Sequence, residues 1–413
     1  MIWKRPSLRR AGRVRGAPRT GVIARIGAPP LIALTCSLGL LALLFCALFV
    51  PGFVRPADAD TTSSTQAVPG DISPGQPTTT DPAPIKLVPV EPSPGRQLVT
   101  LPWGSGAGQV GLVRPAEGLT RGPEALAVAP DGRMVVLDSV NSRLVLLAAD
   151  GSFSGTIPLT LSQPRFLAVD NGLIYVLDAD TDQQLVCVDW QGTKLRSTHL
   201  PAVDDVVTGL FVTADGPCVE VAHDAVFAVE FKDSGTLGAG MSAGQAAAAL
   251  ESAPAALHGI AGRPLDRDLS KAAKITFKPK DGVKLKRFMV DKKSYKGVQT
   301  RASTPTFAQG RGIEHLVSVD GDGQGGVIIG ARLLRAKSDP KDAPSLIVGR
   351  LAAGADQTGG TPVLTDTVTL SDSPFAYLGQ PYVVAPDGRI LQPVGSEAGY
   401  SIVVYSLPGG VQP

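Results

Sequence analysis

A six-residue phrase, VAPDGR, occurs twice in this chain, at residues 128–133 and again at 384–389. It belongs to a longer pattern of a short apolar strand, a turn signal and a second strand. The copies are LAVAPDG, LAVDNG, LFVTADG, LVSVDGDG and YVVAPDG, and ITFKPKDGVKLKRFMVD fits as a sixth with one extra residue in its turn. Such a unit buries its apolar surface only by stacking against neighbouring copies, so the repeat restricts the fold strongly.

The spacing of the copies indicates the architecture. Equivalent apolar residues stand at Val128, Val169, Val212, Phe277, Val319 and Val384, which gives intervals of 41, 43, 65, 42 and 65 residues. A unit of about 42 residues that holds four short strands is typical of a propeller blade. We therefore predict an all-β fold, a six-bladed β-propeller over residues 96–407, with insertions near 233–270 and 335–361. The two long intervals leave five or seven blades as alternative counts.

The last repeat contains only three recognisable strands before the chain ends. An apolar segment, RQLVTLPW at residues 96–103, precedes the first repeat and belongs to none of the six. Pairing this N-terminal strand with the last blade would remove two open sheet edges. We therefore predict ring closure by the N-terminal strand.

The first repeat carries a more specific signature. GPEALAVAPDGRMVVLDSVNSRLVLL, residues 122–147, resembles an NHL repeat in its turn and in the spacing Asp138-x-x-Asn141-x-Arg143, with weaker echoes that start at Asp178 and Asp291. The match is specific only over this first blade. It implies a propeller of the NHL and gluconolactonase-like kind, which serves both enzymes and binding modules. The three signature side chains are interpreted as structural, because Asp and Asn stabilise tight turns.

The N-terminal region predicts export. Residues 1–30 carry eight Lys or Arg and no acid, and residues 31–50 form an uncharged apolar run. A helix of that length spans a bilayer, and the cations place the N-terminus in the cytoplasm. We expect a single-pass protein of the inner (cytoplasmic) membrane with a periplasmic or extracellular propeller; the alternative is a signal peptide cleaved after Ala59, which yields a secreted protein. Residues 51–95, rich in Pro and Thr, are expected to be a disordered linker.

Charge is unevenly distributed beyond the basic N-terminus. Residues 31–413 hold 31 basic against 37 acidic residues, which argues against nucleic acid as a partner. Nine of the 15 lysines nevertheless fall within residues 271–296. An alternating hairpin there would place Lys274, Lys278, Lys284 and Lys286 on its outer side. This face either binds an anionic partner or is a solvated surface whose lysines discourage edge pairing.

Ligands of propellers commonly lie at the mouth of the central channel. Four positions ahead of the repeat anchors stand the candidate ligand-binding residues Glu124, Arg165, Thr208, His315 and Gln380. The gluconolactonase-like resemblance implies a divalent metal held by Glu, Asn and Asp. Only Glu124 has a counterpart here, with Glu314 or His315 as possible helpers, so we predict no metal site and no cofactor.

Two further motifs are weaker. Ser242 lies in a G-x-S-x-G match at residues 240–244, but no buried strand precedes it, so no catalytic residue is assigned. The run of acids at Asp320 and Asp322 lacks the distal Glu of a calcium loop. Cys187 and Cys218 fall in predicted strands of an exported domain, where a disulfide is allowed if the geometry permits.

These features favour an exported, membrane-tethered propeller that acts as a binding or scaffold module of the cell envelope. Its partner is expected to be an unknown protein or an anionic envelope ligand. One alternative is a metal-dependent, lactonase-like hydrolase at the channel mouth. Another is a structural subunit of an envelope assembly.

Overall fold

The computed structural model describes residues 93–170, 172–178, 183–201, 205–231, 255–278, 282–307, 313–323, 325–334, 346–351, 362–364, 366–371 and 375–407. The predicted basic segment, apolar span and almost all of the linker lie outside these ranges, as does Ser242. Within the described ranges, no helix is long and apolar enough to cross a bilayer.

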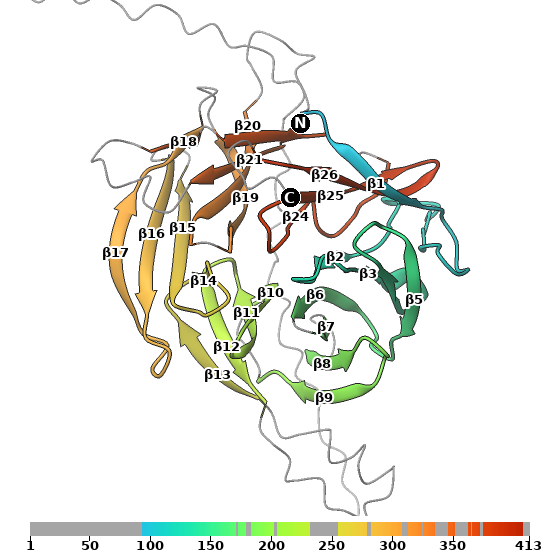
Figure 1. Cartoon of the computed structure of the whole chain (residues 1–413), viewed down its shortest axis with the longest axis horizontal. Helices are drawn as coiled ribbons and strands as arrows, with labels where there is room; N and C mark the ends of the chain where they lie inside the picture. Colours follow the sequence, from blue (N-terminus) through green and yellow to red (C-terminus); the bar gives the residue numbers. More distant parts are fainter. Residues whose placement is uncertain are drawn as a thin grey trace, which may run out of the picture. The chain divides into compact units, whose positions relative to one another are not determined.

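Six four-stranded antiparallel sheets, numbered here as blades 1 to 6, follow one another around a ring (Figure 1). Blade 1 contains β2 (Ala125–Val128), β3 (Met134–Asp138), β4 (Arg143–Leu147) and β5 (Phe153–Pro158). Blade 2 contains β6 (Pro164–Asp170), β7 (Leu173–Asp178), β8 (Gln184–Asp189) and β9 (Lys194–His199). Blade 3 contains β10 (Val207–Thr213), β11 (Gly216–Val221), β12 (Ala225–Glu230) and β13 (Ala256–Ile260). The predicted six-bladed propeller is confirmed.

The second half of the ring is less regular. Blade 4 contains β14 (Arg263–Pro264), β15 (Lys271–Lys278), β16 (Gly282–Val290) and β17 (Gly297–Ser303). Blade 5 contains β19 (Ile313–Gly321), β20 (Val327–Leu333), β21 (Leu346–Leu351) and β23 (Asp366–Leu370). Blade 6 contains β24 (Val383–Val384), β25 (Ile390–Ser396), β26 (Gly399–Tyr405) and β1 (Arg96–Leu101). A short parallel pair, β18 (Thr306–Phe307) with β22 (Val363–Leu364), accompanies blade 5.

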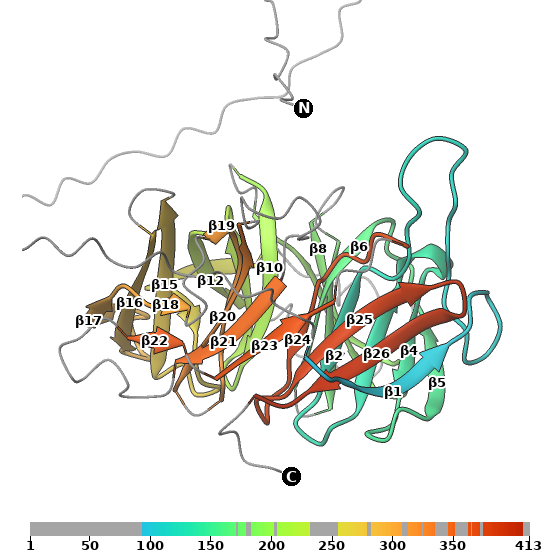
Figure 2. The ribbon, with the colours of Figure 1, turned by 90° about the horizontal axis from the view of Figure 1, so that it is seen from above.

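The N-terminal strand closes the ring. β1 pairs antiparallel with β26, with Arg96 opposite Val404 and Leu101 opposite Tyr400 (Figure 2). The hydroxyls of Thr100 and Ser401 are 2.7 Å apart. The first strand in sequence therefore completes the last blade, as predicted, and this explains why the repeated phrase stands near both ends of the chain.

Apolar packing between the blades forms one cluster at each junction. Alternate residues of each strand point to opposite faces, so each blade contributes apolar side chains to the junctions on both of its sides. Leu137 and Val176 belong to the cluster between blades 1 and 2, while Val136 and Ile402 belong to the one between blades 6 and 1. The other four clusters occupy the remaining junctions in turn. The ring is thus held mainly by contacts between neighbouring blades.

The sequence alignment of blade 4 was wrong by one strand. Phe277, taken as the anchor of an inner strand, lies in β15, the second strand, and the inner strand is the two-residue β14. β14 consists of Arg and Pro and has no apolar run, so the D-G turn between β15 and β16 was mistaken for the turn after an inner strand. β13 and β14 occupy the last part of the predicted insertion 233–270, and β21 lies within 335–361.

The signature residues of blade 1 are structural, as interpreted from the sequence. Asp138 is fully buried, and its carboxylate accepts hydrogen bonds from the Gly111 amide (3.0 Å), the Asn141 side chain (2.7 Å) and Arg143 Nε (3.0 Å). Arg143 also donates to the Ser105 and Gln109 carbonyls, both at 2.7 Å. The three side chains therefore fix the loop before blade 1 and the 3₁₀ turn η1 (Ser139–Asn141).

Only one of the two weaker echoes is equivalent. Asp178 ends β7, is buried, and accepts the amides of Ser162 (3.0 Å) and Gln163 (2.9 Å). Asp178 therefore fixes the segment before blade 2, as Asp138 fixes the loop before blade 1. Asp291 instead follows β16, the third strand of blade 4, and caps the β16–β17 turn through Ser294. The echo at Asp291 was wrong for the same reason as the blade 4 anchor.

Candidate binding sites around the channel

The inner strands of the six blades enclose a cavity of about 450 Å³. Four of the repeat anchors, Val128, Val169, Val212 and Val384, contribute to its apolar wall. Asp170 of blade 2 and Arg267 of blade 4 also line it and form an ion pair at 2.8 Å. The repeat pattern in the sequence thus corresponds to the lining of the central channel.

A second cavity, of about 310 Å³, lies where the chain enters the inner strands of blades 1 and 2. It brings together two of the predicted candidates, Glu124 and Arg165, with Arg121, which sequence reasoning missed. Ser139, Val140, Ser162, Gln163, Pro164, Val113 and Gly122 complete its lining. Arg121 Nη2 donates to Glu124 Oε1 at 2.8 Å; the Arg121 side chain is 62% exposed and that of Glu124 only 6%.

The other three channel-mouth candidates lie apart from this cavity. The Gln380 side chain lines the channel and accepts the Leu126 amide at 2.9 Å, which ties blade 6 to blade 1. Thr208 Oγ1 donates to Glu220 Oε2 at 3.1 Å. His315 is exposed on β19, beside the exposed Glu314. Selecting the residue four positions ahead of each repeat anchor therefore grouped residues that the structure separates.

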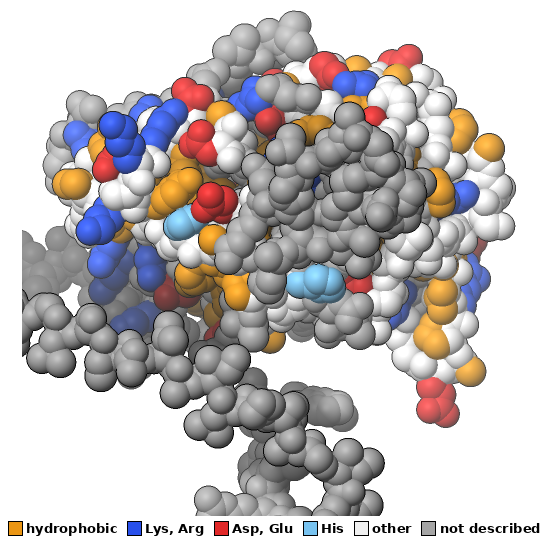
Figure 3. All heavy atoms as spheres, turned by 90° about the horizontal axis from the view of Figure 1, so that it is seen from below, with side chains coloured by type: hydrophobic (Ala, Val, Ile, Leu, Met, Phe, Trp, Pro, Cys, Tyr) orange, Lys and Arg blue, Asp and Glu red, His pale blue; other side chains and the backbone are white. Residues whose placement is uncertain are grey.

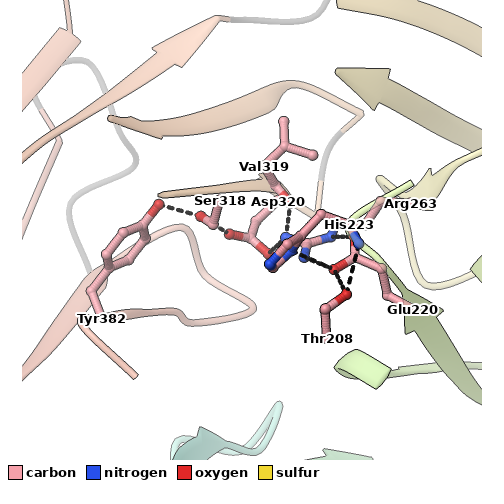
Figure 4. A network of polar contacts seen from close by, with 8 residues as sticks. All are labelled: Thr208, Glu220, His223, Arg263, Ser318, Val319, Asp320 and Tyr382. Atoms are coloured by element: carbon pink, nitrogen blue, oxygen red, sulfur yellow. Dashed lines mark hydrogen bonds and ion pairs between the residues drawn. The ribbon is translucent and has the colours of Figure 1, made fainter. Parts of the chain in front are cut away.

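A buried polar network spans blades 3 to 6 (Figure 4). At its centre is Arg263 of β14, which donates to both carboxylate oxygens of Glu220 at 3.2 and 2.9 Å and to Asp320 Oδ1 at 3.1 Å. Its guanidinium also bonds the Val319 carbonyl and lies 4.3 Å from the centroid of the Phe211 ring. Arg263 therefore joins three blades through one side chain.

The network continues into blade 6. Ser318 Oγ donates to Asp320 Oδ2 at 2.7 Å and lies against the hydroxyl of the buried Tyr382. Gly330 faces that hydroxyl, since a Cβ at Gly330 would lie 2.0 Å from it. Any larger residue at Gly330 would displace Tyr382, so the close approach requires glycine.

The ionisation of the network follows from its burial and pairing. Burial alone would raise the pKa of Glu220, but hydrogen bonding from His223 and the charge of Arg263 outweigh it and hold that pKa at about 2. Burial alone would lower the pKa of Arg263, but Asp320 and Glu220 raise it. Burial raises the pKa of Tyr382. At neutral pH the centre of the network is thus the Arg263 cation bonded to the ionised Glu220, and Asp320 Oδ1 lies 3.1 Å from the same guanidinium.

The two acidic residues at the β19–β20 turn form ion pairs with arginines. Asp320 bonds Arg263, while Asp322 pairs with Arg350 at 2.7 Å and accepts the Gly326 amide at 2.7 Å. In the part of the chain that the structure describes, no cluster of three or more His, Cys, Asp or Glu could hold a metal ion. These two carboxylates therefore serve as internal ion-pair partners.

The lysine face of the blade 4 hairpin is composed of Lys274, Lys278, Lys284 and Lys286. Lys274 stands directly opposite Lys286 across β15 and β16, and Lys284 is opposite Thr276. Lys278, Lys284 and Lys286 are exposed, while Lys274 is 34% exposed and pairs with Asp224 at 2.6 Å. Val283 and Leu285 are buried on the opposite face. Figure 3 shows Lys and Arg side chains gathered toward the side of the ring where blade 4 lies.

The possible disulfide is not formed, because Cys187 and Cys218 are free and buried. Cys187 packs in the cluster between blades 2 and 3 together with Val219. Cys218, next to Val219 in β11, points to the opposite face and packs between blades 3 and 4. The two thiols therefore occupy different junctions of the ring.

Both thiols are expected to resist alkylation in the native protein. Burial raises the pKa of Cys187 to about 11 and that of Cys218 to about 12, so neither forms the reactive thiolate at neutral pH. Mass spectrometry after iodoacetamide treatment at pH 7.5 should find both unmodified, and both labelled once urea unfolds the chain. A reductant should leave the melting temperature unchanged; a drop in that temperature would contradict the free-thiol assignment.

No protein-family model matches the sequence, and no curated protein matches it. Among solved structures, the chain is similar to hydrazine synthase of Kuenenia stuttgartiensis (16% identity, 68% of this chain and 76% of that chain covered, TM-score 0.39). It is also similar to a protein of unknown function from Bacteroides caccae (11%, 61% and 82%, 0.35) and to a streptogramin B lyase (10%, 68% and 92%, 0.36). Likenesses this weak carry no argument about activity, and the assignment of the fold to the six-bladed β-propellers rests on the strand pairing itself.

Proposed function

We propose that this protein is an exported, membrane-tethered β-propeller that binds an anionic ligand of the cell envelope through the lysine face of blade 4. Residues 31–50 serve as the membrane anchor and residues 51–95 as the tether. The propeller is a non-enzymatic binding module, and its NHL-like signature has a structural role in blade 1.

The concentration of charge in blade 4 carries this proposal. Residues 271–303 hold 11 basic and two acidic residues, whereas the rest of 31–413 holds 20 basic and 35 acidic. Lys278, Lys284 and Lys286 are exposed on this face, whereas Lys274, opposite Lys286, is paired with Asp224 at 2.6 Å. The local positive potential of these lysines on an otherwise acidic body attracts and orients a polyanion.

The lactonase-like alternative is not favoured by the surroundings of Glu124. The carboxylate of Glu124 is engaged by Arg121, and Gly379 packs against its other oxygen, since a Cβ at Gly379 would lie 2.6 Å from Glu124 Oε2. A carboxylate that bonds an arginine is a poor ligand for a divalent cation. A structural role in an envelope assembly remains the alternative if no anion binds.

Two variants with equal loss of charge test the lysine face. Replacing Lys278, Lys284 and Lys286 with glutamine should weaken binding of poly-L-glutamate by tenfold or more at low salt, at about 0.5 to 1 kcal/mol per lysine. Replacing Lys292, Lys293 and Lys296, which are exposed in the β16–β17 turn, removes the same charge elsewhere in blade 4 and should have a much smaller effect.

The measurement is the dissociation constant of the full chain in a neutral detergent at two salt concentrations. The wild type and the turn variant should lose affinity steeply with salt, because exposed charges are screened. Equal losses of affinity in the two variants would show that binding responds to net charge alone. This result would contradict the proposal that the lysine face is the binding site. No binding of poly-L-glutamate by the wild type would move the assignment to a structural subunit.

A further inference from the structure

We infer that the central channel is a binding site for an uncharged small molecule that has an apolar body and a hydrogen-bond acceptor. The channel cavity of about 450 Å³ falls within the range for small-molecule pockets, and most of its described lining residues are apolar. The cavity lies among the inner strands in the middle of the ring (Figure 1), and no lysine is among its described lining residues. The inference therefore does not depend on the anionic ligand proposed for blade 4.

The body of the channel is an apolar wall to which several blades contribute. Leu167 and Val169 of β6 and Leu210 of β10 line it and are buried. Val212 of β10 and Val384 of β24 also line it, and both remain partly exposed. A ligand that covers them removes apolar surface from water, which favours its binding. The wall therefore suits hydrocarbon or aromatic groups.

The charged side chains of the described lining already have partners within the protein. They are Asp170, Asp266, Arg267 and Asp320. Asp170 and Arg267 form an ion pair at 2.8 Å, and Asp320 accepts a bond from Arg263 at 3.1 Å. The carboxylate of Asp266 accepts the hydroxyl of Ser270 at 2.6 Å and its amide at 2.8 Å. A charged ligand would lose its hydration here without meeting a charged group that lacks partners, and this cost favours an uncharged ligand.

The side-chain amide of Gln380 offers a hydrogen-bond donor to a ligand. Gln380 lines the channel and is partly exposed. Its Oε1 accepts the Leu126 amide at 2.9 Å, and this bond sets which end of the side-chain amide faces blade 1. An amide nitrogen carries two N–H donors, and Nε2 of Gln380 bonds no atom of the described residues. A carbonyl or other neutral acceptor on the ligand would satisfy this donor.

The donor and the acidic residues belong to opposite ends of the inner strands. Gln380 stands before β24 and bonds Leu126 near the start of β2. Asp170 is the last residue of β6, and Asp320 is the last but one of β19. A ligand whose acceptor meets Gln380 thus has the apolar wall for its body. Shape and polarity both favour a molecule with one polar end.

The test uses acetophenone, an uncharged molecule with one carbonyl acceptor, and two charged molecules of similar size, benzoate and benzylammonium. Saturation-transfer NMR is recorded on the full chain at pH 7 in a neutral detergent, with empty micelles as the blank. Acetophenone should bind, and both ions should bind at least about tenfold more weakly, because each would lose its hydration in the channel.

Three variants locate the binding. Gln380→Glu keeps an acceptor for the Leu126 amide but replaces the donor with a negative charge, so it should weaken acetophenone binding by about tenfold and strengthen binding of benzylammonium. Val212→Phe enlarges a partly exposed wall residue and should weaken acetophenone binding without favouring benzylammonium. Gln191→Glu makes the same change of charge in the exposed β8–β9 turn and should leave both affinities unchanged.

Opposite effects of Gln380→Glu on acetophenone and benzylammonium distinguish a ligand contact from a structural role, because a damaged channel would weaken binding of both. No binding of acetophenone, equal binding of acetophenone and benzoate, or wild-type affinity for acetophenone in Gln380→Glu would overturn the inference. The lysine variants of blade 4 should bind acetophenone normally, so this site and the proposed function stand or fall separately.

Discussion

Replacing Arg263 with methionine is expected to lower the free energy of unfolding at pH 7 by about 3 to 5 kcal/mol, because it leaves the buried carboxylate of Glu220 without its cation. Glu220 is 5% exposed and loses both of its bonds to the guanidinium. Methionine keeps apolar contact with Phe211, so the loss of stability comes mainly from the missing charge. Urea unfolding monitored by circular dichroism measures this loss of stability.

The same variant should change how stability depends on pH. In the native protein the pKa of Glu220 is about 2, below its ordinary value of 4.5, so its ionised form stabilises the fold above pH 4.5 and this contribution is lost as the pH falls toward 2. Without Arg263, burial should raise the pKa of Glu220. The difference in stability between wild type and Arg263→Met should therefore be largest at pH 7 and shrink on acidification through pH 4.5.

A double variant serves as the control. Adding Glu220→Gln to Arg263→Met removes the stranded charge, so it should recover part of the lost stability at pH 7. A difference between wild type and Arg263→Met that stays constant from pH 7 to pH 3 would show that the loss comes from packing alone.

A chain that begins at Pro102 lacks β1 and is expected to lose the cooperative thermal transition of the propeller. The truncation exposes the edge of β26 and removes Leu101, which is 3% exposed in the junction between blades 6 and 1. It also removes Ser93, whose amide and hydroxyl bond Thr369 of blade 5 at 2.9 and 3.0 Å. An unpaired sheet edge beside an opened apolar cluster favours aggregation.

The matched control is a chain that begins at Ser93 and keeps β1. Differential scanning calorimetry and light scattering should show a sharp transition and a monodisperse protein for the control, and a broad or absent transition with aggregation for the truncated chain. The same transition temperature in both would mean that the ring does not need β1 for its stability.

Regular blades could be predicted from the sequence because their inner strands are apolar runs before a D-G or N-G turn. Val128, Val169, Val212 and Val384 were therefore placed correctly along the channel. Blade 4 was not, because β14 has only Arg263 and Pro264 and gives no periodic signal.

The candidate sites were predictable only where they depend on local sequence. Glu124 and Arg165 share a cavity because they hold equivalent positions in adjacent, regular blades. Arg121 had a local signal, since it stands three residues before Glu124, but no repeat marked it. The Arg263 network depends on contacts with Glu220 and Asp320, 43 and 57 positions away, which no short pattern encodes.

Closure by the first strand also has a consequence for the time course of synthesis. Thr100 and Ser401 are 301 positions apart, so β1 leaves the ribosome long before its partner exists. At about 5 to 20 residues per second, the strand waits roughly 15 to 60 seconds for β26. Blades 1 to 5 can assemble during this interval, whereas blade 6 forms only after β26 has been synthesised. β1 therefore stays unpaired until β26 has been synthesised, and it is the segment of the nascent propeller that most needs protection by a chaperone.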